Sequence, residues 1–173
     1  GAEAAAEIHV VPVHVDRAHE TVHVRVPRQK RPGREVDRRS VVARDLAGAR
    51  VLITGATGGI GGSIARAVHA RGAELVLTGR RADILDELAA EVGGKTIAAD
   101  LSDPASLADL MAQAGGIDVL VANAALPGDG ALARLTEAEI DGVLDVNLRA
   151  PIVLSQWAAE QMVPRGRGRI VLI

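Results

Sequence analysis

The chain has 173 residues, a formal net charge of −2 and no cysteine. This length suits one domain, the absence of cysteine excludes disulfides and thiolate metal sites, and the small net charge gives no argument for nucleic acid or an anionic membrane. No apolar run approaches the roughly 18 residues that span a bilayer, and the N-terminus lacks the apolar core of a signal peptide, so we expect a soluble cytoplasmic protein.

Residues 1–45 differ in composition from the rest of the chain. Two stretches, Ile8 to Val15 and Thr21 to Val26, alternate Val with His or Arg and predict a small hairpin. Residues 28–39 contain six basic and two acidic residues, which is typical of a solvated linker or disordered arm. A nucleic-acid arm is the alternative, but no aromatic residue interleaves these charges. The histidines of this region fit no compact metal motif, so we expect no metal site.

Residues 46–173 alternate short apolar runs with amphipathic stretches. The last two amphipathic stretches are either separate helices or one continuous helix. This alternation predicts an α/β fold, a Rossmann-type doubly wound parallel sheet that is incomplete, with about five strands. Its ligand crevice is expected at the carboxyl ends of the strands. The expected strands are Val51–Thr54, Glu74–Thr78, Thr96–Ala99, Asp118–Ala122 and Gly168–Ile173, and the expected helices lie near 60–71, 82–91, 104–114, 136–147 and 150–163.

A glycine-rich turn, Thr54 to Gly61, joins the first of these strands to the first helix. Gly55 is expected to make the tight turn, while Gly59 and Gly61 let a pyrophosphate and the helix approach closely. The free N–H groups of the helix start favour an anion. A tight turn without a ligand is the alternative. The cofactor-binding residues predicted here are Thr54, Gly55, Thr57, Gly59, Ile60 and Gly61.

The second strand ends in Gly79, Arg80 and Arg81. A carboxylate at this position would bind the ribose 2′-hydroxyl of NAD, whereas arginine suits a 2′-phosphate. The sequence therefore favours NADP over NAD. Two solvated arginines at a helix start are the alternative interpretation.

Two further strand ends carry polar residues. Asp100 and Leu101 follow the third strand, where the carboxylate can either accept a hydrogen bond from an adenine amino group or cap the next turn. Asn123 and Ala124 follow the fourth strand, where the Asn amide can tie neighbouring backbone groups together. We therefore add these four residues to the predicted cofactor site.

Together these motifs resemble the short-chain dehydrogenase/reductase family over about residues 50–173. Residues 54–61 read TGATGGIG and fit the family's TGxxxGxG, while the segment from Asn123 to Ala125 stands in place of its NAG motif. Asn147 is similar to the helix Asn that holds a water in the family's proton relay. The resemblance implies hydride transfer between NADP(H) and a small carbonyl or alcohol substrate. It also implies that the helix over 150–163, which carries Trp157, either packs its apolar side in the core or pairs with its twin in a homo-oligomer.

The family's catalytic set is mostly missing from this chain. The resemblance implies a Tyr acid/base, a Lys, a Ser after the fifth strand and the helix Asn, but the chain has no Tyr, and Lys30 and Lys95 both precede Asn147. Ser155 lies upstream of the fifth strand. Only Asn147 is left as a predicted catalytic residue. Both chain ends look cut, so we expect the N-terminal part of an NADP-dependent oxidoreductase, inactive by itself. The alternative is a non-catalytic dinucleotide-binding module.

Overall fold

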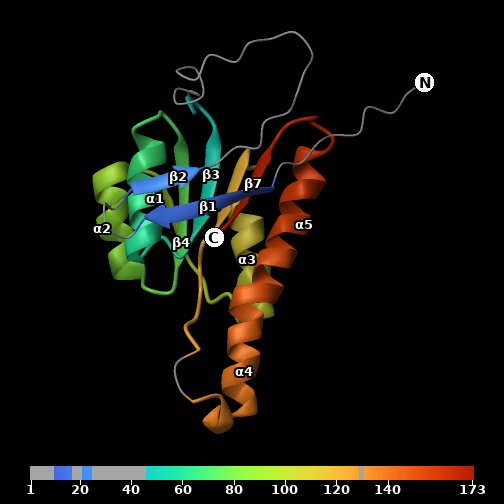
Figure 1. The fold of residues 1–173 in the computed structure, drawn as a ribbon. Coiled ribbons are helices and arrows are strands. Elements are labelled where there is room, and N and C mark those ends of the chain that lie inside the picture. Colours follow the sequence, from blue (N-terminus) through green and yellow to red (C-terminus); the bar gives the residue numbers. More distant parts are fainter. Residues whose placement is uncertain (1–9, 17–20, 25–45, 129–130) are drawn as a thin grey trace, which may run out of the picture.

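The computed structural model describes residues 10–16, 21–24, 46–128 and 131–173 (Figure 1). The basic stretch over 28–39 lies outside the described residues. So does most of the segment that joins the N-terminal strands to the α/β part of the chain.

Five parallel strands form the sheet, as the sequence predicts, in the order β7-β6-β3-β4-β5. The chain winds outward from β3 to β4 and β5, then returns to β6 and β7 on the other side. This reversal between β3 and β6 is the switch point of a doubly wound fold. The strands are β3 Arg50–Thr54, β4 Glu74–Gly79, β5 Lys95–Ala98, β6 Val119–Ala122 and β7 Arg169–Leu172.

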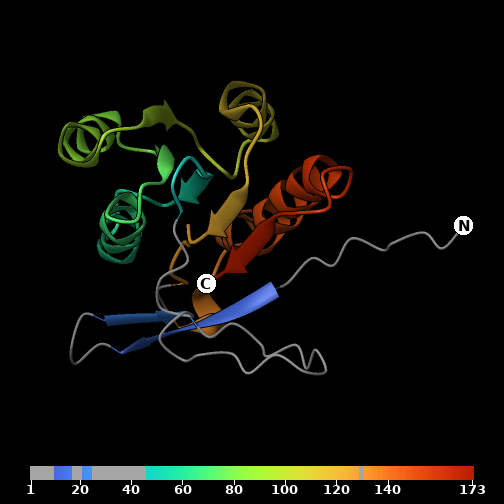
Figure 2. The ribbon, with the colours of Figure 1, turned by 90° about the horizontal axis from the view of Figure 1, so that it is seen from above.

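Helices cover both faces of this sheet (Figure 2). Alternate strand residues point to opposite faces, so Leu52 packs with α3 and α5 while Val51 and Ile53 pack with α1 and α2. Both cores are almost entirely aliphatic, and Trp157 is half-buried against the α3 and α5 side. The helices are α1 Gly59–His69, α2 Ala82–Val92, α3 Pro104–Ala114, α4 Glu137–Leu144 and α5 Ala150–Met162.

The helix starts follow capping chemistry. Asp103 caps α3 by accepting from the N–H groups of Ala105 and Ser106, with Pro104 in the first turn. Thr136 and Glu139 form a capping box at the start of α4. A π-helical turn, η2 Asp145–Arg149, joins α4 directly to α5. The two stretches expected near 136–147 and 150–163 are therefore continuous.

The N-terminal strands extend the sheet at the β7 edge. Strand β1, Val10–Asp16, runs parallel to β7, and β2, Thr21–Val24, pairs antiparallel with β1. Together they bring the sheet to seven strands, and β1 covers the backbone edge that β7 would otherwise expose. Among the described helices, none is long and apolar enough to cross a membrane.

Candidate functional site

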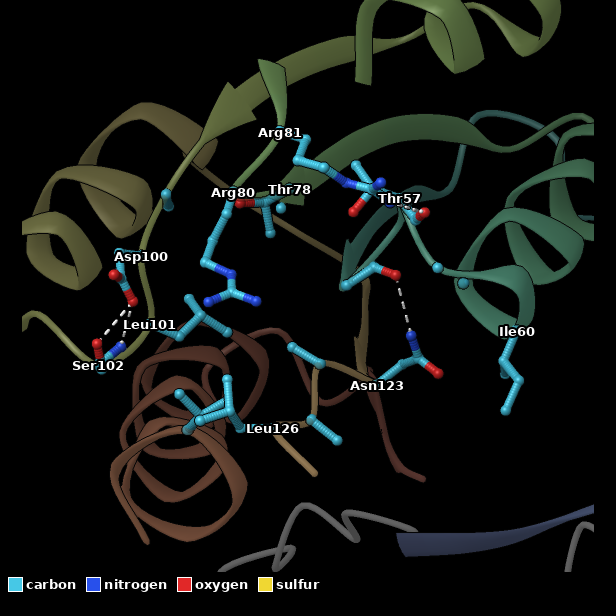
Figure 3. A pocket seen from close by; sticks show the side chains of 18 of the residues that line it. Thr57, Ile60, Thr78, Arg80, Arg81, Asp100, Leu101, Ser102, Asn123 and Leu126 are labelled. Atoms are coloured by element: carbon cyan, nitrogen blue, oxygen red, sulfur yellow. Dashed lines mark hydrogen bonds between the residues drawn. The ribbon is translucent and has the colours of Figure 1, made fainter. Parts of the chain in front are cut away.

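A pocket of about 730 Å³ lies at the carboxyl ends of β3, β4 and β5, beside the switch point. Every predicted cofactor-binding residue except Thr54 lines it, and they come from four separate loops. Figure 3 shows these loops converging on one space. The predicted residues that line the pocket are Gly55, Thr57, Gly59, Ile60, Gly61, Arg80, Arg81, Asp100, Leu101, Asn123 and Ala124.

Three of the four glycines of the loop, those predicted to contact a cofactor, have different surroundings. Gly55 has a φ of +65° and turns the chain at the end of β3. A Cβ on Gly61 would lie 2.2 Å from the carbonyl oxygen of Gly55, so Gly61 lets α1 pack against the loop. A Cβ on Gly59 would meet nothing within 4 Å. Gly59 is exposed and lines the pocket, so its backbone is open to the approach of a bound anion.

Thr54 joins the start of the glycine loop to the end of β6 through hydrogen bonds. Its side chain is buried, and its Oγ1 accepts hydrogen bonds from the N–H groups of Asn123 and Ala124, both at 3.0 Å. In return, the Asn123 amide donates to the carbonyls of Thr54 at 3.0 Å and Gly55 at 3.3 Å. The Asn amide thus ties neighbouring backbone groups together, and it locks the end of β6 to the start of the glycine loop.

The two arginines after β4 point in different directions (Figure 3). Arg81 donates from Nη2 to the carbonyl oxygen of Thr57 at 2.9 Å. Arg80 is exposed, reaches into the pocket above Leu101, and makes no hydrogen bond with any described residue. Its charge helps to lower the pKa of Asp100. The pocket therefore presents one uncommitted guanidinium, that of Arg80.

Asp100 is committed to the turn that follows β5. Its Oδ1 accepts from the Ser102 hydroxyl at 2.7 Å and from the Ser102 N–H at 2.9 Å. These bonds, the hydroxyl first, hold the pKa of Asp100 below its ordinary value, with a smaller contribution from Arg80. The turn-capping interpretation is thus confirmed for Oδ1, and only Oδ2 is left for a ligand.

Asn147 lies in the π-helical turn and clamps the loop after β6. Its Oδ1 accepts from the Leu126 N–H at 2.7 Å, and its Nδ2 donates to the Leu126 carbonyl at 2.9 Å. π-Turns within helices often mark functional positions. Both halves of the amide are engaged, so the side chain fixes Leu126 and has limited capacity left for a water.

A second hollow of about 470 Å³ lies between β6, β7 and the start of α5. Its walls are mainly apolar, with Leu148 55 % and Ile152 58 % exposed. The Ser155 hydroxyl at its wall is buried and has no hydrogen-bond partner among the described residues. Asn147 stands at this hollow and not at the larger pocket.

Sequence reasoning missed three residues that shape the site. Thr78 and Leu126 line the pocket, and Ser102 holds Asp100 in place. Thr78 was detectable, because it stands directly before the Gly79–Arg80 pair at a strand end. Leu126 was not, because its role depends on backbone groups that any residue would supply.

The comparisons with known proteins agree with this geometry. The family model described as short chain dehydrogenase matches residues 49–173. Nodulation protein G of Rhizobium sp. (strain N33) is 42 % identical over 135 residues, covering 75 % of this chain and 55 % of that protein. The 3-oxoacyl-[acyl-carrier-protein] reductase FabG of Rickettsia conorii is 37 % identical over 131 residues, covering 75 % and 54 %.

Among solved structures, a metagenomic short-chain oxidoreductase in complex with NADP superimposes with a TM-score of 0.69 at 36 % identity. The match covers 74 % of this chain and 62 % of that one. The chain thus spans about half the length of the curated relatives it matches.

Proposed function

The chain belongs to the short-chain dehydrogenase/reductase family, and from that premise we propose that its larger pocket binds NADP(H), with NAD(H) the weaker ligand. The observation that carries this proposal is the uncommitted guanidinium of Arg80 in a pocket built from the glycine loop. A solved relative is in complex with NADP.

The pocket has the shape and the donors that a dinucleotide needs. Gly59 leaves open space beside the start of α1, where the first N–H groups of a helix favour an anion. Arg80 suits the 2′-phosphate through charge-assisted hydrogen bonds. Oδ2 of Asp100 and the side chain of Leu101 then border the adenine end, and Asn123 and Ala124 border the nicotinamide end.

We propose that the whole protein is an oxidoreductase of this family, acting on a small carbonyl or alcohol substrate. The bound dinucleotide supplies or accepts hydride. Of the residues described here, Asn147 contributes by holding the Leu126 backbone beside the pocket. The chain contains no Tyr, so the family's acid/base is not among its residues, and we propose that residues 1–173 alone do not turn over substrate.

A titration with the reduced dinucleotides tests the cofactor assignment. We expect NADPH to bind the 173-residue chain more tightly than NADH, as followed by the change in nicotinamide fluorescence. Arg80→Ala should weaken NADPH about ten- to a hundred-fold, which is the value of one or two charge-assisted hydrogen bonds, and leave NADH nearly unchanged. Arg167→Ala, in the loop before β7, is the matched control. Equal affinities of the wild type for NADPH and NADH would refute the assignment.

A non-catalytic dinucleotide-binding module is the second candidate, and the absence of Tyr is the observation that favours it. It predicts the same titration, so binding does not separate the two candidates. The coding sequence after residue 173 does, because an in-frame continuation into a Ser and a Tyr-x-x-x-Lys supports the enzyme.

We also propose self-association through α5. Leu148, in η2 directly before α5, and Ile152, in α5, lie four residues apart, each with more than half of its area exposed, and exposed apolar surface of this kind marks interaction sites. Ile152→Lys should then shift a dimer to a monomer in sedimentation, whereas an unchanged distribution would place the contact elsewhere.

A further inference from the structure

The adjacent arginines Arg80 and Arg81 make different contacts at the same loop. Arg81 bonds to the carbonyl oxygen of Thr57 at 2.9 Å, while Arg80 extends into the pocket (Figure 3). Both side chains are exposed. Their difference is therefore not one of burial but of what each guanidinium contacts.

With the bond from Arg81, both polar groups of the peptide unit between Thr57 and Gly58 are hydrogen-bonded. The Thr57–Gly58 peptide has a carbonyl, which accepts from Arg81, and an N–H, which donates to the Gly55 carbonyl at 3.1 Å. With both polar groups bonded, this peptide plane has little freedom to rotate. The next residues, Gly59 and Ile60, begin α1.

The end of β4 is built to bring Arg81 to this carbonyl. A Cβ on Gly79 would lie 3.1 Å from both Cγ2 and Oγ1 of Thr57, so Gly79 lets the glycine loop lie directly against the strand end. The N–H of Ala56 also donates to the Thr78 carbonyl at 3.0 Å. Arg81 follows in an extended conformation at the N-cap of α2, and this places its side chain alongside Thr57.

We propose that Arg81 is a positioning residue that fixes the Thr57–Gly58 peptide, and thereby aims the N–H groups at the start of α1 towards the pyrophosphate. This inference rests on the proposed dinucleotide function. Arg80 then determines the choice between NADP(H) and NAD(H), because only NADP(H) carries the 2′-phosphate. Arg81 determines the affinity for both, because both carry the pyrophosphate.

The competing arrangement has both guanidiniums on the 2′-phosphate. The two arrangements differ in the ratio of the NADPH and NADH affinities. If Arg81 only fixes the loop, its loss lowers the affinities for NADPH and NADH by the same factor. If Arg81 contacts the 2′-phosphate, its loss lowers the affinity for NADPH alone.

The experiment compares Arg81→Ala, Arg81→Lys and Arg80→Ala in the 173-residue chain. Each variant is titrated with NADPH and with NADH, and amide hydrogen exchange is measured over residues 56–62 without ligand. We expect Arg81→Ala to weaken both ligands about tenfold, the value of one hydrogen bond from a charged donor, with an unchanged ratio. We expect faster exchange of the Gly58 amide, whose N–H donates to the Gly55 carbonyl, in Arg81→Ala but not in Arg80→Ala.

Arg81→Lys keeps the positive charge but loses the planar guanidinium. It should recover part of the lost affinity for both ligands equally. A fall in NADPH affinity alone, or unchanged exchange in Arg81→Ala, would overturn the inference. If the wild type binds neither dinucleotide, the proposed function fails, while the exchange comparison still decides whether Arg81 holds the loop.

Discussion

The two hollows at the carboxyl end of the sheet differ in what lines them. Around the larger pocket several polar side chains are bonded, as with the Asn123 amide on Thr54 and Gly55 and Arg81 on Thr57. The walls of the second hollow are mainly apolar, with the bonded Asn147 amide among them. Each hollow also has one buried hydroxyl without a hydrogen-bond partner among the described residues, Thr78 at the larger pocket and Ser155 at the second hollow.

This difference indicates that the larger pocket is formed by contacts within the described residues, whereas the second hollow leaves apolar surface that the described residues do not cover. The larger pocket is held together by hydrogen bonds that join the ends of β3, β4, β5 and β6, all within the described residues. The second hollow exposes large apolar side chains such as Ile152 and Leu148, and exposed apolar surface is stabilised by being covered. The predictions below test how much the polar contacts around each of the two hollows stabilise the fold.

The largest expected effects come from two of the glycines that line the larger pocket, Gly59 and Gly61. Gly59→Val puts a side chain into open space, so the fold should hold while NADPH affinity falls about a hundred-fold or more, roughly 3 kcal/mol. Gly61→Ala instead forces a Cβ to 2.2 Å from the Gly55 carbonyl, so its free energy of unfolding should fall by about 1–3 kcal/mol. Urea unfolding and NADPH titration of both variants check the pair. Normal NADPH binding by Gly59→Val would mean that the ligand lies elsewhere.

The next effect concerns the bond network between β3 and β6. Asn123→Ala leaves the carbonyls of Thr54 and Gly55 without the amide that bridges them, so the free energy of unfolding should fall by about 2 kcal/mol. Urea unfolding measures this fall, with Asn147→Ala as the comparison at the second hollow. A loss below about 0.5 kcal/mol in Asn123→Ala would show that water replaces the amide at little cost.

A stabilising change is expected at the second hollow. Ser155→Ala removes a buried hydroxyl that no other described residue bonds, so the free energy of unfolding should rise by about 1 kcal/mol. Exposed Ser63, whose hydroxyl donates to the Gly59 carbonyl at 2.8 Å, supplies the control as Ser63→Ala. Destabilisation by Ser155→Ala would indicate that the hydroxyl is satisfied in solution, and the contrast between the two hollows would weaken.

The fold was predictable from the sequence because its cause is local. Apolar runs such as Val51–Thr54 alternate with amphipathic stretches, and the observed bounds differ from the expected ones by at most two residues, except that α4 ends at Leu144 and the π-helical turn follows. The parallel pairing of β1 with β7 was not predictable. This pairing joins segments about 160 residues apart. It is made by backbone groups, which are the same in every residue, so the sequence does not indicate which strands pair.

The sequence was sufficient to predict which residues line the candidate site, but not what each side chain contacts there. The strand ends placed Arg80, Arg81 and Asp100 at one pocket, because parallel strands share an edge. The direction of each side chain depends on neighbours that a one-dimensional pattern does not contain. Thus Arg81 faces Thr57, and Asp100 faces Ser102.

The smallest expected effect is a pH dependence at Asp100. Its pKa is lowered in the folded chain, chiefly by the Ser102 hydroxyl and N–H, so the folded state binds the proton less readily than the unfolded state. The resulting stability is fully present above the ordinary pKa of 3.8 and is lost as pH falls through the lower folded value.

Asp100→Asn keeps an acceptor for Ser102 but removes the charge. Because Asp100 is exposed, the wild type should exceed this variant by less than about 0.5 kcal/mol at pH 6, and the excess should shrink progressively as the pH falls below the ordinary pKa of 3.8. Urea unfolding at pH 6 and at a series of pH values below that ordinary pKa, with Asp109→Asn on the exposed side of α3 as control, measures the excess. An excess that does not change over this series would mean that the carboxylate contributes through shape and not through charge.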